Sequence, residues 1–321
     1  MTNTVVPAQW MDWIAENRAR GVPEHTLFDI MVSNGFDAPT ARRQVTEAVP
    51  STNPGKLECL MNIYSDLLAH CNGLIGIERE ENLSPEQFFR WYYAGNRPVI
   101  LSGLMANWNQ WSPEYLRWRC SGETVEVMTG RDSDAQYEIN CEAHKVRMSM
   151  DQFVGMVEHA GETNDFYMVA NNRSNGAGPL RALLDEIPPF EGFLDPRRAA
   201  GDSVFFWFGP AGTKTPLHHD TMNILLAQAF GRKRITLIPS FESHLVYNHI
   251  GVYSQVDCEK PDLERFPLFA KATRFETVLE PGEVLFIPVG WWHQVRSLDV
   301  SVSVSFTNFL VPNAYRWTEG I

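Results

Sequence analysis

The stretch "TPLHHDTMNILLAQAFGRKRITLIP", residues 215–239, decides the fold of this chain. Its apolar runs are strand-like, and Gly231 supplies a turn signal between them. The stretch therefore predicts one β-hairpin. On a strand, His218 and Asp220 share a face because side chains alternate across it, whereas His219 faces away and is not expected to ligate a metal.

Polar groups inside an apolar strand must be hydrogen-bonded, paired or bound to something, so His218 and Asp220 are either satisfied strand residues or metal ligands. His293 in "EPGEVLFIPVGWWHQV", residues 280–295, is the best candidate for a third ligand. Two histidines and one carboxylate leave coordination positions open, which is typical of non-haem iron sites that react with O₂. A His-x-Asp triplet alone is weak evidence, and the combination with His293 strengthens it.

Lys233 follows the Gly231 turn and is expected on the strand next to that of His218. A buried lysine beside a metal site needs an anionic partner. A dicarboxylate co-substrate would be such a partner, so Lys233 adds a binding residue to the predicted site.

Composition limits the class of protein. The chain has 321 residues, of which 44% are hydrophobic and 21% charged, which fits a soluble globular protein. A net charge of −12 without a Lys/Arg run predicts no nucleic-acid partner. Five cysteines without a C-x-x-C pair favour a reducing compartment. With neither a signal peptide nor an apolar run of ~18 residues, we expect a cytoplasmic protein without a membrane partner.

The pattern along the chain predicts two domains. Residues 1–50 have helical spacing and predict a helical accessory module, and residues 57–321 predict the catalytic domain. The predicted fold is mainly β with flanking helices, because short strands separated by Gly/Pro turns favour a sandwich or barrel over about 200–310. The predicted strands are 203–208, 222–229, 233–238, 275–278, 284–287 and 300–309.

Several motifs together resemble the JmjC/cupin-like Fe(II)- and 2-oxoglutarate-dependent oxygenases, including the asparaginyl hydroxylases and bacterial cupin-like members of that family. The motifs are "TPLHHD", "LLAQ", "GRKR", "EPGEVLFIPVGWWHQV", the insert "SQVDCEKPDLERFPLF" (254–269) and "SPEQFFRWYYAGNRPVILSGLMANW" (84–108). The resemblance covers about residues 83–310 and implies a double-stranded β-helix, or jelly-roll, core.

Matched residue by residue, the resemblance implies that His218, Asp220 and His293 bind Fe(II). It assigns Lys233 to the distal carboxylate of 2-oxoglutarate, and Thr215 assists it. Tyr167 in "FYMVANN", residues 166–172, matches a tyrosine that often does the same.

Two family positions differ. An asparagine six residues after the first histidine ligand is replaced by Ile224, with Asn223 one place early, and a second is replaced by Ser305. Whether Asn223 or Ser305 contacts the co-substrate stays open.

The implied function is hydroxylation of a C–H of an amino-acid, peptide or protein side chain. O₂ and 2-oxoglutarate are consumed, and succinate and CO₂ are the co-products. Demethylation by the same chemistry is open, and the sequence sets no oligomeric state. One alternative is a metal-binding cupin of another reaction class, either an isomerase or a dioxygenase that does not use 2-oxoglutarate. A second is a catalytically silent binding protein. The lysine argues against the first alternative and the complete ligand set against the second.

Overall fold

The computed structural model describes residues 5–19, 21–47, 56–71, 76–106, 108, 111–169, 180–198 and 203–315. The chain divides into two compact units. The helical unit contains residues 1–75 and 241–273, and the barrel unit contains residues 76–240 and 274–321. The 241–273 segment therefore interrupts the barrel unit in sequence and clusters with the N-terminal residues.

The helical unit begins with the helices that the N-terminal periodicity predicts. Asp37 caps the third helix, since its Oδ1 accepts from the backbone N–H of Thr40 at 2.9 Å. Leu27 and Met31 are fully buried and contribute to a small apolar core. The helices are α1 (Ala8–Ala19), α2 (Glu24–Ser33), α3 (Ala38–Glu47) and α4 (Lys56–His70).

The 241–273 segment has short elements and is closed at its ends by one buried carboxylate. Glu242 Oε2 accepts from the Thr273 backbone N–H at 2.7 Å, and Oε1 accepts from its hydroxyl at 2.9 Å. The elements are η4 (Ser240–Leu245), β9 (Asn248–Ile250), β10 (Tyr253–Ser254) and η5 (Pro267–Lys271).

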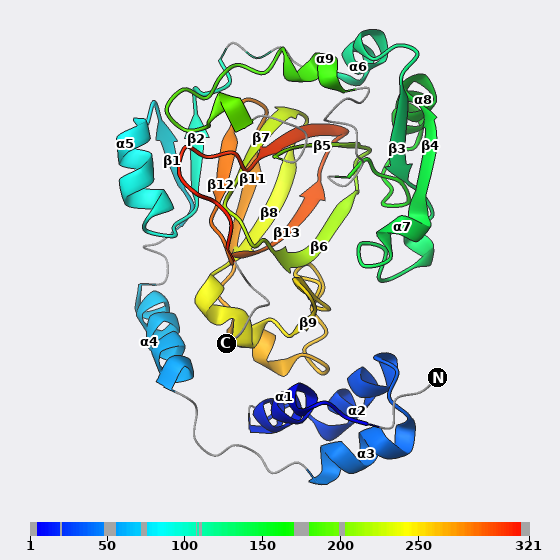
Figure 1. Ribbon diagram of the computed structural model, residues 1–321, viewed down its shortest axis with the longest axis vertical. Coiled ribbons are helices and arrows are strands. Elements are labelled where there is room, and N and C mark those ends of the chain that lie inside the picture. Colours follow the sequence, from blue (N-terminus) through cyan, green and yellow to red (C-terminus); the bar gives the residue numbers. More distant parts are fainter. Residues whose placement is uncertain are drawn as a thin grey trace. The chain divides into compact units, whose positions relative to one another are not determined.

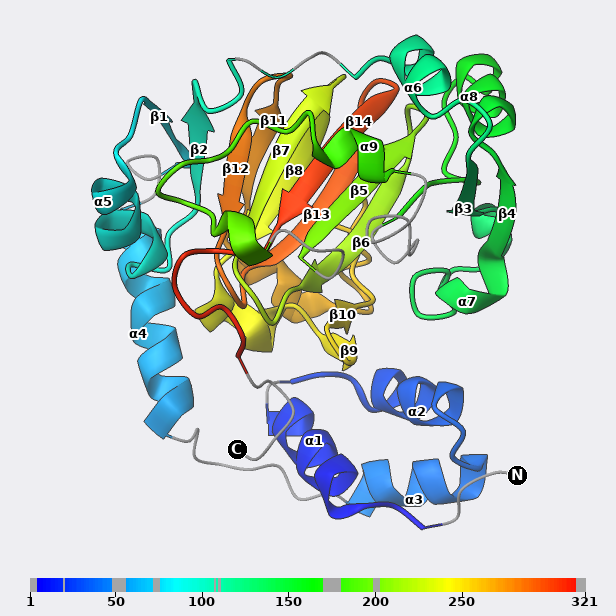
Figure 2. The ribbon, with the colours of Figure 1, turned by 45° about the horizontal axis from the view of Figure 1, so that its top comes forward.

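Two facing sheets form the barrel unit (Figures 1 and 2). The first sheet has the order β1-β2-β12-β7-β14-β5, and within this unit the second has the order β11-β8-β13-β6. Apart from the parallel pair of β1 and β2, the pairs are antiparallel. The strands are β1 (Glu78–Glu81), β2 (Val99–Ser102), β5 (Val204–Gly209), β6 (Lys214–His219), β7 (Ile224–Phe230), β8 (Lys233–Ile238), β11 (Phe275–Leu279), β12 (Val284–Ile287), β13 (Trp292–Ser297) and β14 (Ser301–Phe306).

Helices flank the sheets of the barrel unit. Ser84 caps the first of them and forms a capping box with Gln87, as its position before Pro85 predicts. Figure 2 shows this helix beside β1 and β2, whereas α6 and α8 lie by the hairpin of β3 and β4. These elements are α5 (Pro85–Phe88), η1 (Phe89–Tyr93), α6 (Pro113–Arg119), β3 (Thr124–Met128), η2 (Arg131–Ser133), α7 (Cys141–His144), β4 (Lys145–Ser149), α8 (Met150–His159), α9 (Arg181–Leu184) and η3 (Pro196–Arg198).

Apolar side chains fill the space between the sheets and the space under the helices. One cluster joins β8, β11 and β12 through Leu237, Leu279 and Leu285, each fully buried. A larger cluster includes Phe206 and Phe208 of β5, so both phenylalanines are core residues. The prediction of a jelly-roll core, mainly β with flanking helices, is therefore confirmed.

The prediction of one β-hairpin over 215–239 is wrong. The stretch forms three strands, of which β7 lies in the first sheet and β6 and β8 lie in the second. Lys233 is therefore not on a strand that neighbours that of His218, because β13 lies between β6 and β8 and pairs with both. In a jelly roll consecutive strands cross between sheets, and hydrophobic periodicity does not distinguish this from a hairpin.

Candidate metal centre

Antiparallel pairing brings together three residues that are far apart in the sequence. His218 lies near the end of β6, Asp220 is the first residue after that strand, and His293 lies near the start of β13. His218 and His293 are register partners, and their ring centroids are 4.1 Å apart. His293 Nε2 lies 3.3 Å and His218 Nε2 lies 4.0 Å from Asp220 Oδ2. The three ligand atoms lie within 4.8 Å of one another, which is close enough to share one ion.

The hydrogen bonds of both rings suit a metal at Nε2. His218 Nδ1 lies 2.9 Å from the carbonyl oxygen of Pro216, and His293 Nδ1 lies 3.0 Å from that of Trp291. A carbonyl oxygen only accepts, so each Nδ1 carries a proton, and Nε2 is the ring nitrogen left to face Asp220 and a metal. Backbone carbonyls commonly orient metal-binding histidines in this way. The donor set of two imidazoles and one carboxylate therefore fits a divalent transition metal.

The charges of the group also suit a cation. Burial, and then the neighbouring His293, lower the pKa of His218 to about 4, so its ring is neutral at pH 7. For Asp220, burial alone would raise the pKa, but the hydrogen bond with His293 and the charges of the neighbouring histidines in their protonated forms outweigh burial and lower it. An ionised carboxylate beside a neutral imidazole gives the site the negative charge that a divalent ion requires.

His219 has a different environment from its neighbour. Its ring is fully buried and packs edge-on against Trp292, with the centroids 4.7 Å apart. Trp292 is the register partner of His219 on β13. The adjacent histidines therefore lie in separate surroundings, one by Asp220 and one against an indole.

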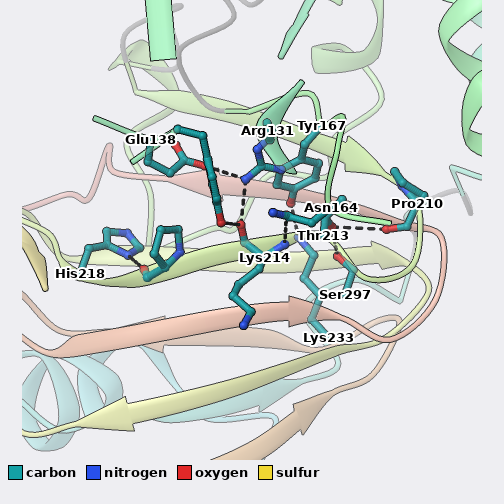
Figure 3. Close-up of polar contacts among 12 residues, drawn as sticks. Arg131, Glu138, Asn164, Tyr167, Pro210, Thr213, Lys214, His218, Lys233 and Ser297 are labelled. Carbon is teal, nitrogen blue, oxygen red and sulfur yellow. Dashed lines mark hydrogen bonds and ion pairs between the residues drawn. The ribbon is translucent and has the colours of Figure 1, made fainter. Parts of the chain in front are cut away.

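A buried lysine and a buried tyrosine meet further along the second sheet. Lys233 Nζ donates to the Tyr167 hydroxyl at 3.0 Å, and both residues are 2% exposed (Figure 3). Burial lowers the pKa of Lys233 to about 7 and raises that of Tyr167. Gly209 allows the ring its position, because a Cβ there would lie 2.6 Å from Tyr167 Cδ2. The structure thus brings together two residues separated by 66 positions.

Thr215 and Ser305 are the other two residues considered as co-substrate contacts that lie on strands of the barrel unit. Thr215 is half-buried on β6 and pairs with Val295. The Ser305 hydroxyl accepts from Trp207 Nε1 at 3.0 Å, and the Trp207 ring lies 6.1 Å from that of Tyr167.

Asn223 serves the fold. Its Oδ1 accepts from the Val289 backbone N–H at 2.9 Å, and its Nδ2 donates to Asn313 Oδ1 at 3.0 Å. The oxygen and the nitrogen of the side-chain amide therefore bind the turn at Val289 and the C-terminal segment at Asn313, respectively.

Sequence reasoning missed Arg131 and Glu138, which lie next to Tyr167 (Figure 3). The Arg131 side chain is fully buried, and its Nη2 lies 2.9 Å from Glu138 Oε1. Its guanidinium carbon lies 5.2 Å from the centroid of the Tyr167 ring. The surrounding sequence, "GRDSDAQYE", has the composition of a solvated loop, so no pattern signals this burial.

A jelly roll with a His-x-Asp and a distant histidine at one position defines the class of cupin-like metal proteins. Comparison with known proteins agrees, since residues 85–308 match the family described as "Cupin-like domain". The chain therefore belongs to this family, and the JmjC/cupin-like resemblance inferred from its motifs is confirmed.

The chain is similar to named proteins from several organisms. The chain is 36% identical over 241 residues to "Lysine-specific demethylase 8" of Xenopus tropicalis, covering 70% of this chain and 50% of that protein. It is 44% identical over 240 residues to "JmjC domain-containing protein D" of Dictyostelium discoideum, covering 69% and 53%. It is 28% identical over 260 residues to the human "tRNA wybutosine-synthesizing protein 5", covering 76% and 81%. The chain thus spans about half the length of the first two.

Family membership supports the oxygenase class that the resemblance implied over the isomerase and silent-binding alternatives. Within the residues that the structure describes, no helix is long and apolar enough to cross a bilayer.

Proposed function

We propose that this protein is an Fe(II)- and 2-oxoglutarate-dependent oxygenase that hydroxylates a C–H of an amino-acid, peptide or protein side chain. One observation carries the proposal. His218, Asp220 and His293 converge, with both Nδ1 atoms committed to backbone carbonyls. Iron, once bound, supplies the chemistry by which O₂ oxidises 2-oxoglutarate and the substrate.

The protein's own residues would bind and orient the reactants. His218, His293 and Asp220 would hold the metal and leave positions open for the co-substrate and O₂. Lys233 supports the co-substrate assignment, because no carboxylate in the described part of the chain pairs with it, although it is buried. Its ammonium and the Tyr167 hydroxyl would bind the distal carboxylate, with Thr215 assisting.

The proposed class of substrate comes from the named relatives. A side chain of an amino acid, peptide or protein fits the relatives named lysine-specific demethylases. Hydroxylation of an N-methyl group leads to demethylation, so hydroxylase and demethylase activities differ in the carbon attacked. A net charge of −12 argues against a nucleic-acid substrate, despite the relative named as tRNA-modifying.

The experiment is an assay of the full chain with Fe(II), ascorbate, 2-oxoglutarate and a library of peptides and amino acids. We expect succinate in the wild type and none in Asp220→Ala. Mass spectrometry should find a gain of one oxygen for hydroxylation, or the loss of a methyl group for demethylation. Direct binding of 2-oxoglutarate is measured in parallel, because turnover without substrate is slow. A wild-type chain that binds neither iron nor 2-oxoglutarate would rule the proposal out.

Two organisational predictions accompany the proposal. We infer a helical accessory module at 1–50 and a catalytic domain at 57–321, and limited proteolysis tests this division. We also infer a cytoplasmic location, which the five free cysteines support. Fractionation of the source cells tests that inference.

A further inference from the structure

The guanidinium of Arg131 is anchored beside Tyr167 by several groups. It lies over the Tyr137 ring at 4.2 Å from the centroid and over the Tyr167 ring at 5.2 Å. Its Nη2 donates to Glu138 at 2.9 Å and to the backbone carbonyl of Lys214 at 2.8 Å (Figure 3). These contacts connect the turn after β3, the tyrosine that receives the Lys233 hydrogen bond, and the first residue of β6.

Global stability does not account for this buried pair. Among the described residues, Arg131 Nε and Nη1 are buried without a hydrogen-bond partner. Unsatisfied buried donors and a desolvated ion pair both cost free energy, and apolar residues of similar volume are often as stable or more so. A role in placing neighbouring groups is therefore the better physical explanation for a buried Arg131–Glu138 pair.

Arg131 contacts the surroundings of two residues proposed to bind 2-oxoglutarate. It packs on the Tyr167 ring, and it binds the carbonyl of Lys214, the residue before Thr215. The Lys214 carbonyl also accepts from the Tyr137 hydroxyl at 2.9 Å, and the Lys214 N–H donates to Asn164 Oδ1 at 2.8 Å. Lys214 is thus fixed on both sides directly before Thr215. Arg131 packs on the Tyr167 ring as well, so one side chain holds the surroundings of both hydroxyl groups.

We propose that Arg131, held by Glu138, is a positioning residue of the co-substrate pocket. It sets the Tyr167 hydroxyl, and the backbone before Thr215, in the geometry that binds the distal carboxylate. This inference rests on the proposed function. Loss of a partner that orients a metal ligand typically costs roughly 10- to 100-fold in metal affinity or activity, and we expect a loss of similar size for this co-substrate pocket.

The test is calorimetric titration of 2-oxoglutarate into the full chain loaded with Mn(II), which binds without turnover. We expect Arg131→Met to raise the Kd for 2-oxoglutarate at least tenfold while the Kd for Mn(II) stays within twofold. The matched control is Arg117→Met, which removes a half-buried arginine paired with Glu158 and Asp151 and should change neither constant. In a Tyr167→Phe background, Arg131→Met should add less than threefold, because both changes remove the same hydroxyl contact.

Further variants separate positioning from folding. Arg131→Lys keeps the charge but not the planar fork, so it should fold and still weaken 2-oxoglutarate several-fold. Wild-type 2-oxoglutarate affinity in either folded variant would overturn the proposal. Equal losses of 2-oxoglutarate and Mn(II), or effects that multiply with Tyr167→Phe, would also overturn it in favour of a general structural role. A wild-type chain that binds no 2-oxoglutarate would instead refute the proposed function.

Discussion

Replacing Lys233 with methionine should stabilise the protein and remove its co-substrate affinity. Lys233 is 2% exposed, and burial lowers its pKa from 10.5 to about 7. At 1.36 kcal/mol per pKa unit, this difference corresponds to about 5 kcal/mol of unfavourable burial. Replacing a buried ion pair with apolar side chains of similar volume is often neutral or stabilising by about 1–4 kcal/mol, and a gain within that range is expected for this single buried charge. We therefore expect Lys233→Met to raise the free energy of unfolding by about 1–4 kcal/mol.

The stability advantage of Lys233→Met over the wild type should decrease as pH rises. Below pH 7 the lysine is protonated in both folded and unfolded chains, so the full cost applies. Between about pH 7 and pH 10.5 the unfolded chain binds a proton that the folded chain does not. The wild type therefore gains stability relative to the variant as pH rises, by about 3 kcal/mol between pH 7 and pH 9.5.

Binding of 2-oxoglutarate should show the opposite pH dependence. An ammonium is needed to pair with the carboxylate, so affinity in the wild type should fall above about pH 7, by up to tenfold per pH unit. The assays are denaturant unfolding at pH 6.5 and pH 9.5, and calorimetric titration with 2-oxoglutarate. A variant no more stable than wild type at pH 6.5, or one that binds 2-oxoglutarate equally well, would refute this reasoning about Lys233.

Two further predictions concern single positions with a control close by. His218→Asn should abolish binding of Fe(II) or Mn(II) in a titration of the chain with metal. The control is His219→Asn, because His219 packs against the indole of Trp292, and this variant should still bind one ion per chain. Equal losses in both variants would contradict the ligand assignment. Gly209→Ala should weaken 2-oxoglutarate roughly tenfold, because its Cβ would meet Tyr167 Cδ2 at 2.6 Å. Gly155→Ala on α8, where a Cβ meets nothing within 4 Å, should bind as the wild type does, and calorimetry compares the two.

The sequence predicted a β-rich sandwich or barrel because its strand and turn signals are local, and the resemblance to the cupin-like family implied that it is a jelly roll. Turns at Gly231 and Gly282 and the β-prone runs between them mark strands without knowledge of their partners. The pairing of the strands is not local. β8 could pair directly with β6 or be separated from it by β13, and the outcome depends on how consecutive strands alternate between the two sheets. The hairpin prediction failed because β13 lies between β6 and β8.

The candidate site was predictable to the extent that residue type carries its chemistry. Histidine and aspartate at alternate positions, and a lysine in an apolar run, are unusual enough to indicate a site. Arg131 and Glu138 are ordinary in a polar loop, and only tertiary packing buries them. The backbone carbonyls that fix each Nδ1 are likewise absent from any side-chain pattern.

The central claim is that one metal ion binds His218, Asp220 and His293 together. Anomalous diffraction at the iron edge, from crystals grown anaerobically with Fe(II) and 2-oxoglutarate, tests it most directly. We expect a single peak about 2 Å from both Nε2 atoms and an Asp220 oxygen, with the distal carboxylate of 2-oxoglutarate against Lys233. A peak at another cluster, or contact with fewer than these three residues, would contradict it.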